Sequence, residues 1–593
     1  MMTLSRSKRD TVEKLFLSLI GVQMLSFISL IISNVIDAIA IKRCLGTDAL
    51  AAYSFSNTVI SIEMAAFGFL MQGVSVLLSR NAGEQDAGKR NSAFSTAILL
   101  ALAVGAVLTV MFIGASYMMA DVVGTPAHLR DLSASYIRGN ALGIIPYLLF
   151  AVFSASTIIE GGKRQLMLSF VVMAATDIVL DFLNGYVLGF GIWGMGAATA
   201  ASEFVAFAVV VVFYLRGRKL FRFVPGLFDK VYAKDTFEYG YMYVVKQLML
   251  TVLGYVYNNY ITFKYGSNVL AVYAAAFSAL SLLQCLSSAI GNTVSTLTGF
   301  YAKEEDGTSL KSMMRASVKY SGILNAAIII VSISVAGPVM RMFYKANDEF
   351  FVTAVEAFRL FSLSIVFRSI NMAIRGYYQS MKMQVHNMLF TFVETLVCEV
   401  LSLIVLCEVL GMSGIWLSFV AGEMLALLLL TVVLMIGRGT KDCLDAWMCL
   451  PPTWSGKCAE RFVSSCHSAD EIMACSEAIC DFFHRNGASD RTSNVLSLAV
   501  EEIGRNTVQY GFIDGRGHSI DIRAKRIDGA WMLIFHDDCM GFDPTKYLIP
   551  SDSGGEHNGI RMVSGLVSEM TYANALGINN LFIQIKDENN APL

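Results

Sequence analysis

The chain has 593 residues, of which 55% are hydrophobic and only 16% charged. Soluble domains usually carry about 25% charged residues, so a fully soluble protein is excluded and much of the surface must face something other than water. The formal net charge of −2 also argues against a nucleic-acid-binding protein, which would show a basic stripe. We therefore expect the lipid bilayer, and no nucleic acid, as a partner.

Twelve apolar runs are each long enough to cross a bilayer, which takes about 20 mostly apolar residues in a helix. In the first half of the chain they cover residues 15–41, 51–79, 92–119, 136–159, 166–188 and 192–215. In the second half they cover residues 240–263, 270–300, 317–343, 354–380, 385–410 and 413–436. The sequence therefore predicts a membrane all-α part with twelve transmembrane helices.

Basic residues indicate which side of the membrane each loop occupies. They gather in the N-terminal segment and in the even-numbered loops, where the second loop alone contains Arg80, Lys89 and Arg90. Lys and Arg are enriched in loops that stay in the cytosol. We therefore expect a multi-pass protein of a bacterial inner (plasma) membrane, with both termini in the cytosol.

Parts of the second half repeat the first half at a nearly constant distance. Gly46-Thr-Asp-Ala-Leu-Ala-Ala-Tyr53 matches Gly266-Ser-Asn-Val-Leu-Ala-Val-Tyr273 at a shift of 220 residues, and further matches follow in the same order. We therefore expect two six-helix bundles, residues 1–220 and 235–437, that share one orientation in the membrane. Two such bundles suit the alternating access of a transporter, and a duplicated anchor or scaffold is the alternative.

Two stretches of these bundles resemble a known transporter family. Ile36-Asp-Ala-Ile-Ala-Ile-Lys-Arg-Cys-Leu-Gly-Thr-Asp-Ala-Leu-Ala-Ala52 looks like the first-helix signature of MATE (multidrug and toxic compound extrusion) transporters. Asp177-Ile-Val-Leu-Asp181, followed by Gly191-Ile-Trp-Gly-Met-Gly-Ala-Ala-Thr199, resembles the fifth and sixth helices of that family. The resemblance covers residues 10–437 and implies a cation-coupled antiporter that exports small organic compounds, cationic or amphipathic ones being the family default.

Acidic residues inside the predicted spans are candidate coupling residues. A charge at the bilayer centre costs about 2.5–3.5 kcal/mol, so such residues normally face a cavity or a partner. Asp177 and Asp181 are four residues apart and share one helix face. Two neighbouring carboxylates repel each other, which suits a site that binds and releases protons. The family resemblance adds Asp37 to the same cation site.

The second half contains further charged residues, of which Glu394, Glu399 and Glu423 are acidic. Some sodium-coupled members of the family place an acid in the seventh helix, where this chain has Lys246. This difference favours H⁺ over Na⁺ as the coupling ion. The alternative for all the buried acids is that they pair with Lys or Arg at helix ends.

The composition changes after Arg438, and residues 438–455 are predicted to be a linker. Residues 456–593 are enough for one further domain. Strands are predicted over residues 461–465, 520–525, 531–536 and 580–586, and helices over residues 469–485, 492–510 and 559–569. The tail is therefore predicted to be an α/β domain.

Three blocks of the tail carry residues suited to nucleotide chemistry. Glu502 and Asn506 lie one helical turn apart, where a carboxylate beside an amide oxygen could hold Mg²⁺ and orient a nucleophile. Asp537 follows an apolar strand and could accept the amino proton of a base, while Gly541 permits a tight loop beside it. Gly559 ends a glycine-containing block before a helix, whose N-terminus favours phosphate.

In this order, the three blocks resemble the GHKL ATPases, an α/β sandwich fold, and among them the anti-sigma-factor serine kinases. The resemblance implies bound ATP and Mg²⁺, with Glu502 as the catalytic residue, Asn506 as the metal ligand and a cytosolic protein as the kinase target. Cys539 replaces the usual first glycine of one block, and Asn558 interrupts another. Three functions are left open: an exporter regulated by its ATP-binding tail, a membrane-bound serine kinase with a MATE-like sensor, and a non-transporting scaffold.

Overall fold

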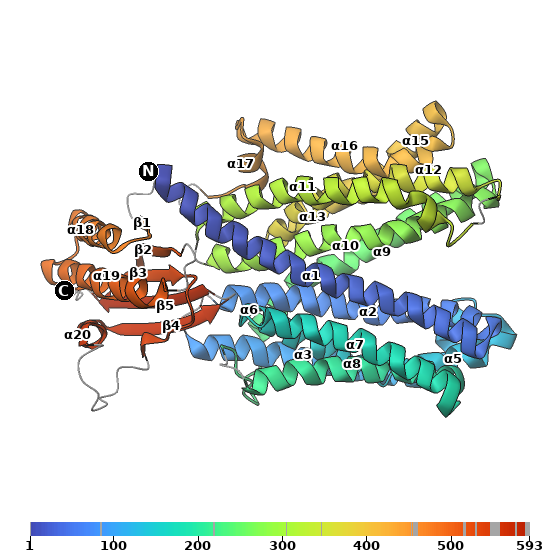
Figure 1. The fold of residues 1–593 in the computed structure, drawn as a ribbon, viewed down its shortest axis with the longest axis horizontal. Helices are drawn as coiled ribbons and strands as arrows, with labels where there is room; N and C mark the ends of the chain where they lie inside the picture. The colour runs from blue at the N-terminus through green and yellow to red at the C-terminus, as the bar shows by residue number, and fades with distance from the viewer. Residues whose placement is uncertain are drawn as a thin grey trace.

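The computed structural model describes residues 2–82, 86–216, 220–303, 305–344, 347–451, 454, 461–513, 518–527, 530–545, 558–575 and 578–586. A long helical part, here called the membrane domain, is followed by a smaller part built around a sheet, here called the C-domain (residues 461–586). Figure 1 shows the C-domain lying against one end of the long helices. We call this end of the membrane domain the C-domain end.

The helices of the membrane domain fall into two halves. The first half contains α1 (Met2–Leu45), α2 (Thr47–Ala82), α3 (Ala87–Gly114), α4 (Ser116–Val122), η1 (Ala127–Leu129), α5 (Arg130–Asn140), α6 (Ile144–Ile159), α7 (Lys163–Leu183), η2 (Asn184–Leu188) and α8 (Gly191–Arg216). The second half contains α9 (Lys230–Tyr265), α10 (Ser267–Lys303), α11 (Gly307–Met340), α12 (Phe351–Ser362), α13 (Ile365–Ser380), α14 (Gln384–Phe392), η3 (Val393–Cys398), α15 (Glu399–Leu410) and α16 (Ser413–Arg438).

One broken helix recurs at the equivalent place in each half. The break between α5 and α6 bends the chain by 43°, and a second break separates α12 from α13. Helix α6 begins at Ile144 and α13 at Ile365, which is 221 residues later, and their last residues, Ile159 and Ser380, are also 221 apart. The structural repeat therefore has the same period as the repeat in the sequence.

Eight helices in the described part of the chain are long and apolar enough to cross a membrane, and the bent pair α5–α6 makes nine. Their outward faces are apolar: Val110 of α3 is 72% exposed and Val433 of α16 is 65% exposed. Side chains of this kind are expected to contact lipid. Each of the twelve predicted spans is helical, but α1, α9 and α12–α13 are outside this set of nine, so the count of twelve stays a prediction.

The two halves contact each other through the part of α2 that lies toward the C-domain end. A Cβ atom on Gly73 of α2 would lie 2.5 Å from the carbonyl oxygen of Thr236 in α9, and one on Gly240 of α9 would lie 2.6 Å from that of Phe69 in α2. Glycine is needed at both positions because the two backbones touch. Arg80 of α2 also donates to the carbonyl oxygen of Ser380 in α13 at 2.9 Å. The halves are thus closed against each other at this end.

A short helix, α17 (Cys443–Met448), lies within the predicted linker and packs on the membrane domain. Tyr377 of α13 donates to the carbonyl oxygen of Met448 at 2.7 Å, and Lys311 of α11 forms an ion pair with Asp445 at 2.6 Å. The membrane domain therefore extends at least to Met448.

The C-domain is an antiparallel sheet with helices on one face. Its elements are β1 (Arg461–Cys466), α18 (Ala469–Arg485), α19 (Asp490–Gly511), β2 (Ile520–Ile527), β3 (Ala530–Asp537), α20 (Asn558–Leu566), β4 (Glu569–Ala575) and β5 (Ile578–Lys586), with strand order β1-β2-β3-β5-β4. Side chains on one face of the strands, such as Leu533 and Ile583, are buried with Ile472 of α18 and Leu496 of α19. The predicted α/β class agrees with this, but the last predicted helix ends at Leu566 and β4 was not predicted.

Candidate functional sites

The three predicted coupling residues meet inside the first half. Asp37 on α1 and both Asp177 and Asp181 on α7 are buried, with no more than 4% of any of them exposed. The carboxyl group of Asp37 is within hydrogen-bonding reach of both other carboxyl groups. Helices α1 and α7 therefore assemble one site from residues that are 140 positions or more apart in the sequence.

Two more buried acids belong to the same half. Asn140, at the end of α5, donates to Glu63 of α2 at 2.5 Å. A Cβ on Gly143 would lie 2.2 Å from a carboxyl oxygen of Glu203 in α8, so this glycine makes room for the carboxyl group in the break between α5 and α6. Neither Asp37 nor Asp181 forms an ion pair with a lysine or arginine among the residues that the structure describes. The first half is therefore rich in buried carboxyl groups, including two without a basic partner among the described residues.

Two of the buried acids in the second half, Glu394 and Glu423, form ion pairs with bases. Arg375 of α13 forms an ion pair with Glu394 of η3, and Arg368 forms one with Glu423 of α16 at 3.5 Å. Lys246 of α9 donates to the sulfur of Met372 at 3.0 Å. Pairing with bases, the alternative reading of the buried acids, therefore describes Glu394 and Glu423, although these pairs lie within the bundle and not at helix ends.

In the C-domain, α19 presents Glu502 and Asn506 next to α20. A Cβ on Gly559, the second residue of α20, would lie 1.8 Å from a carboxyl oxygen of Glu502, so the glycine lets the carboxylate reach the start of this helix. Glu502 also lies 3.7 Å from Arg505. An anion at a helix N-terminus is stabilised by the helix dipole. Glu502 and Gly559 are thus adjacent in the structure, and their joint role in nucleotide binding stays a prediction, while residues 551–557 of the same block lie outside the described residues.

Asp537 ends β3 and is held from two sides. The backbone N–H of Cys539 and the side chain of Asn579 in β5 both donate to Oδ1 of Asp537, at 3.1 and 2.7 Å. Burial raises the pKa of the Asp537 carboxyl above its ordinary value, and the hydrogen bonds from Asn579 and Cys539 partly offset this shift. Gly541 lies beside β4, because a Cβ atom on this glycine would be 3.6 Å from the hydroxyl oxygen of Tyr572.

The loop after β3 also touches α19. A Cβ on Gly511, the last residue of α19, would lie 2.8 Å from the sulfur of Cys539. The structure therefore places Glu502 with Gly559, and Asp537 with Gly541, on two sides of the C-terminal part of α19. Asn579 was not predicted as a site residue, although a polar Asn579-Asn580 pair opening an apolar strand is a visible signal. Tyr572 and Asn574, which both donate to Oδ1 of Asn579, were missed because β4 was missed.

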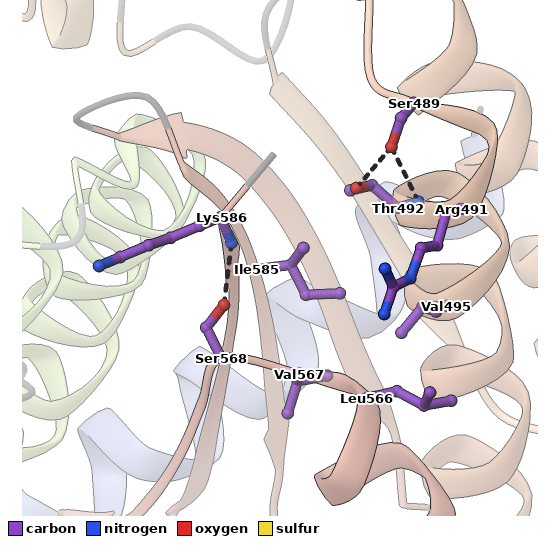
Figure 2. A pocket seen from close by; sticks show the side chains of 9 residues that line it. All are labelled: Ser489, Arg491, Thr492, Val495, Leu566, Val567, Ser568, Ile585 and Lys586. Carbon is purple, nitrogen blue, oxygen red and sulfur yellow. Dashed lines mark hydrogen bonds between the residues drawn. The ribbon is translucent and has the colours of Figure 1, made fainter. Parts of the chain in front are cut away.

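A separate pocket of about 210 Å³ lies at the opposite end of the C-domain sheet (Figure 2). It lies between the start of α19 and the ends of α20 and β5, where Ser489 bonds Thr492 and Ser568 accepts from the backbone of Lys586. Lys586 pairs with Ala530 across the sheet, whereas Asn579 pairs with Asp537. The pocket is therefore seven residues along β5 from Asn579 and is distinct from the predicted nucleotide site.

The membrane domain has relatives among known proteins. The MatE family model matches residues 23–187 and 244–405, more than half of the chain. The probable multidrug resistance protein YoeA of Bacillus subtilis is 23% identical over 351 residues, which are 55% of this chain and 74% of that protein. The multidrug export protein MepA of Staphylococcus aureus is 19% identical over 399 residues, which are 66% of this chain and 87% of MepA.

Solved structures show the same fold in the membrane domain. An outward-facing multidrug resistance MATE family transporter of the MOP superfamily has a TM-score of 0.67 at 21% identity, covering 74% of this chain and 96% of that one. A MOP superfamily transporter from Pyrococcus furiosus, described as having a binding pocket of reverse polarity, has a TM-score of 0.66 with the same identity and coverage. The C-domain lies outside the residues that the family model matches.

Proposed function

This chain belongs to the MatE family of membrane transporters, and from that premise we propose that it exports small organic compounds, cationic or amphipathic ones in particular, across a bacterial inner membrane. Two relatives in this family are named for multidrug export or resistance, which supports the same substrate class here. The distribution of Lys and Arg over the loops supports an orientation with both termini and the C-domain in the cytosol. Substrate would then enter from the C-domain end and leave from the opposite end.

The coupling ion is proposed to bind at Asp37, Asp177 and Asp181. The observation that carries this proposal is that the buried carboxyl group of Asp37 lies within hydrogen-bonding reach of those of both Asp177 and Asp181. Carboxyl groups this close cannot all ionise without strong repulsion, so taking up and giving off a proton is the chemistry that they suit. H⁺ is favoured over Na⁺, because the second half has Lys246 where some sodium-coupled relatives have an acid.

Substitution in this cluster tests the proposal. Inside-out vesicles with an imposed pH gradient should accumulate a fluorescent organic cation, and Asp37→Asn or Asp181→Asn should abolish most of that uptake. Asp121→Asn is the matched control, because Asp121 is a half-exposed acid paired with Arg130 at 2.5 Å at the far end of α3–α5. Uptake by Asp37→Asn and Asp181→Asn at the level of the Asp121→Asn control would remove these residues from the coupling mechanism.

The C-domain is proposed to bind ATP with Mg²⁺ and thereby to regulate transport or to act as a serine kinase. The backbone N–H of Cys539 and the side chain of Asn579 donate to Oδ1 of Asp537, and Oδ2 is proposed to accept from the amino group of a base. Asn506 would hold the metal and Gly541 and Gly559 would let the backbone approach the nucleotide. Glu502 of α19, whose carboxylate lies beside the start of α20, would accept a proton from a nucleophile. The metal would neutralise charge on the phosphates.

Nucleotide binding is tested with the full-length protein in detergent. A fluorescent ATP analogue with Mg²⁺ should bind to the parent protein and lose affinity in Asn506→Ala. Asn494→Ala is the control, because Asn494 is an exposed asparagine on the same helix three turns earlier. Equal affinity in both variants would remove Asn506 from the site. Transfer of labelled phosphate to a cytosolic protein would favour the kinase role, and binding without transfer would favour the regulatory role.

A further inference from the structure

The free face of the C-domain sheet is attached to the membrane domain by a buried ion pair. Arg523 of β2 lies 2.8 Å from a carboxyl oxygen of Asp306, and the two side chains are only 10% and 7% exposed. Asp306 also caps α11, because its other carboxyl oxygen accepts from the backbone N–H of Ser309 at 3.1 Å. Removing one partner of a buried ion pair leaves the other charge poorly compensated, so this pair specifies how the C-domain docks on α11, although Arg523 also lies 3.8 Å from Asp521 of its own strand.

Apolar contacts extend the same interface to both halves. Ile578, the first residue of β5, is buried in one cluster with Val12 of α1 and Phe300 of α10. A small cavity beside them is lined by Tyr301 of α10 and by His536 of β3. The C-domain therefore contacts α1 of the first half and both α10 and α11 of the second half, at the end where the halves are closed against each other.

Strand β3 connects this interface to the predicted nucleotide site. Successive side chains of a strand point to opposite faces. Phe535 is buried under the helices, so Asp537 faces the same side as the helices and Asn579. His536 faces the other side, where it lines the cavity against the membrane domain together with Asp538, the residue after the strand. Asp537 also borders this cavity, so the end of β3 belongs both to the interface and to the predicted nucleotide site.

We propose that the C-domain is a clamp: because it contacts both halves, it holds the C-domain end of the transporter closed. Nucleotide bound at Asp537 changes the strength of this attachment. Opening of this end requires α2 of the first half to separate from α9 and α10 of the second half. The ends of α1 and α10, which the C-domain joins, would then also move apart. The domain must therefore give up one of its two attachments during each opening. The nucleotide clause rests on the proposed function of the C-domain, whereas the clamp itself rests on the interface alone.

The clamp is tested by the accessibility of the closed end. Ser295 of α10 is 1% exposed and bonds Ser380 at 3.0 Å, and Gln72 of α2 donates to it at 3.3 Å across the halves. A Ser295→Cys thiol in full-length protein is labelled with an impermeant maleimide in vesicles that expose the C-domain, and labelling of that peptide is measured by mass spectrometry. The same reporter is present in every variant, so only differences between variants are compared.

Loss of the ion pair should open this end. Arg523→Ala and Asp306→Asn should each raise the labelling rate at least about fivefold, the lower range of coupling between sites in proteins. Asp306→Asn keeps an N-cap acceptor for α11, so its effect reports the charge and not the cap. Arg526→Ala is the matched control, because Arg526 is exposed on the same strand and contacts Trp531 instead. Unchanged labelling in the first two variants, with a C-domain that still resists trypsin, would overturn the clamp.

The nucleotide clause has its own readout in the same vesicles. Binding of the fluorescent ATP analogue is measured first, and the labelling rate is then compared with and without Mg-ATP, with Asp537→Asn as the variant that should not respond. A change in labelling in either direction, absent in Asp537→Asn, supports the clause. Binding without any change in labelling overturns it. Absence of binding instead overturns the proposed nucleotide site, while the comparison of Arg523→Ala with Arg526→Ala still decides the clamp.

Discussion

Asp181 and Glu394 are both carboxylates buried inside the helical bundle, and their surroundings give them different roles. Glu394 has Arg375 as an ion-pair partner, which compensates its charge permanently. Asp181 has two other carboxyl groups beside it and no such partner among the described residues. A charge inside a membrane costs about 2.5–3.5 kcal/mol even on lenient scales, so the acids of the first half favour a bound proton or cation. In the second half, in contrast, Glu394 and Glu423 have arginine partners, which favours a structural role for these two acids.

The pair in the second half should therefore be a stability element. Arg375→Met should lower the free energy of unfolding by about 3–5 kcal/mol, because Glu394 is left buried without a partner. Adding Glu394→Gln should restore most of this loss, since the remaining groups are neutral. Thermal unfolding in detergent measures both effects. Equal stability of the parent and of Arg375→Met would show that water or another base reaches Glu394.

Ionised Asp537 should lower the stability of the C-domain and, at the same time, be needed for binding of the ATP analogue. Its pKa is raised in the folded domain, so ionised Asp537 costs stability, and this cost grows as the pH rises through the raised pKa. Asp537→Asn should therefore stabilise the C-domain at neutral pH while it abolishes binding of the ATP analogue. In the parent protein, affinity should fall as the pH is lowered through the raised pKa, above the ordinary value of about 3.9. Binding that is independent of pH down to that value would contradict this role.

The candidate sites were predictable where the residues carry charge and follow a helical spacing. Asp177 and Asp181 share a face because they are four residues apart, and the position of Glu502 beside Gly559 follows from the order of the blocks. Asn579 was not predictable in the same way, because its role depends on the register of β5 against β3, where it pairs with Asp537. Register is set by long-range pairing, which a single sequence does not reveal.

Among the elements, the helices were predicted well and the breaks in them were not. The apolar runs predicted residues 136–159 and 354–380 as continuous spans, yet α5–α6 and α12–α13 are each broken in the middle. Pro146 stands in the first turn of α6, directly after the first break, whereas no proline lies near the second break. At the first break, Gly143 leaves room for Glu203, so the interruption depends on a contact with another helix. Strand β4 was missed because residues 570–575, which lie between the predicted helix and the last predicted strand, show only a weak alternation of apolar and polar side chains.

The contact between α2 and α9 is sensitive to a single methyl group. Gly73→Ala should destabilise the protein by about 1–3 kcal/mol, because the new Cβ would meet a backbone carbonyl that has no rotamer to move away. Gly322→Ala in α11 is the control, since nothing lies within 4 Å of its Cβ position. There the helix propensity of alanine should stabilise by up to about 1 kcal/mol. Thermal unfolding should therefore move in opposite directions, and a shift in the same direction would contradict the close contact.

At the scale of the whole molecule, the proposed transport and the proposed nucleotide response belong to different parts of the chain. The proposed coupling acids lie in the first half, and the family match ends at residue 405. The C-domain joins the two halves from outside, through α1 on one side and α10–α11 on the other. Removing it should leave the transporter intact but unregulated.

A chain ending at residue 451 tests this division. It keeps α17, whose Met448 and Asp445 contact α13 and α11, so the membrane domain retains its own packing. Uptake of the organic cation driven by a pH gradient should persist and should no longer respond to Mg-ATP. Loss of uptake with normal membrane insertion would mean that the C-domain is part of the transport cycle itself. A truncation after Arg438, which removes α17, should in addition lower the melting temperature.

The backbone contact between Gly73 and Gly240 also bears on the energy supply of the cell. Protons cross proteins along files of water molecules, and such a file needs space between side chains. Two helices that touch through their backbones leave no such space, so no file of water can run between α2 and α9 at this contact. If export is driven by protons as proposed, this contact would help to keep protons from leaking through the idle transporter, and it depends on no side chain whose rotation could open it.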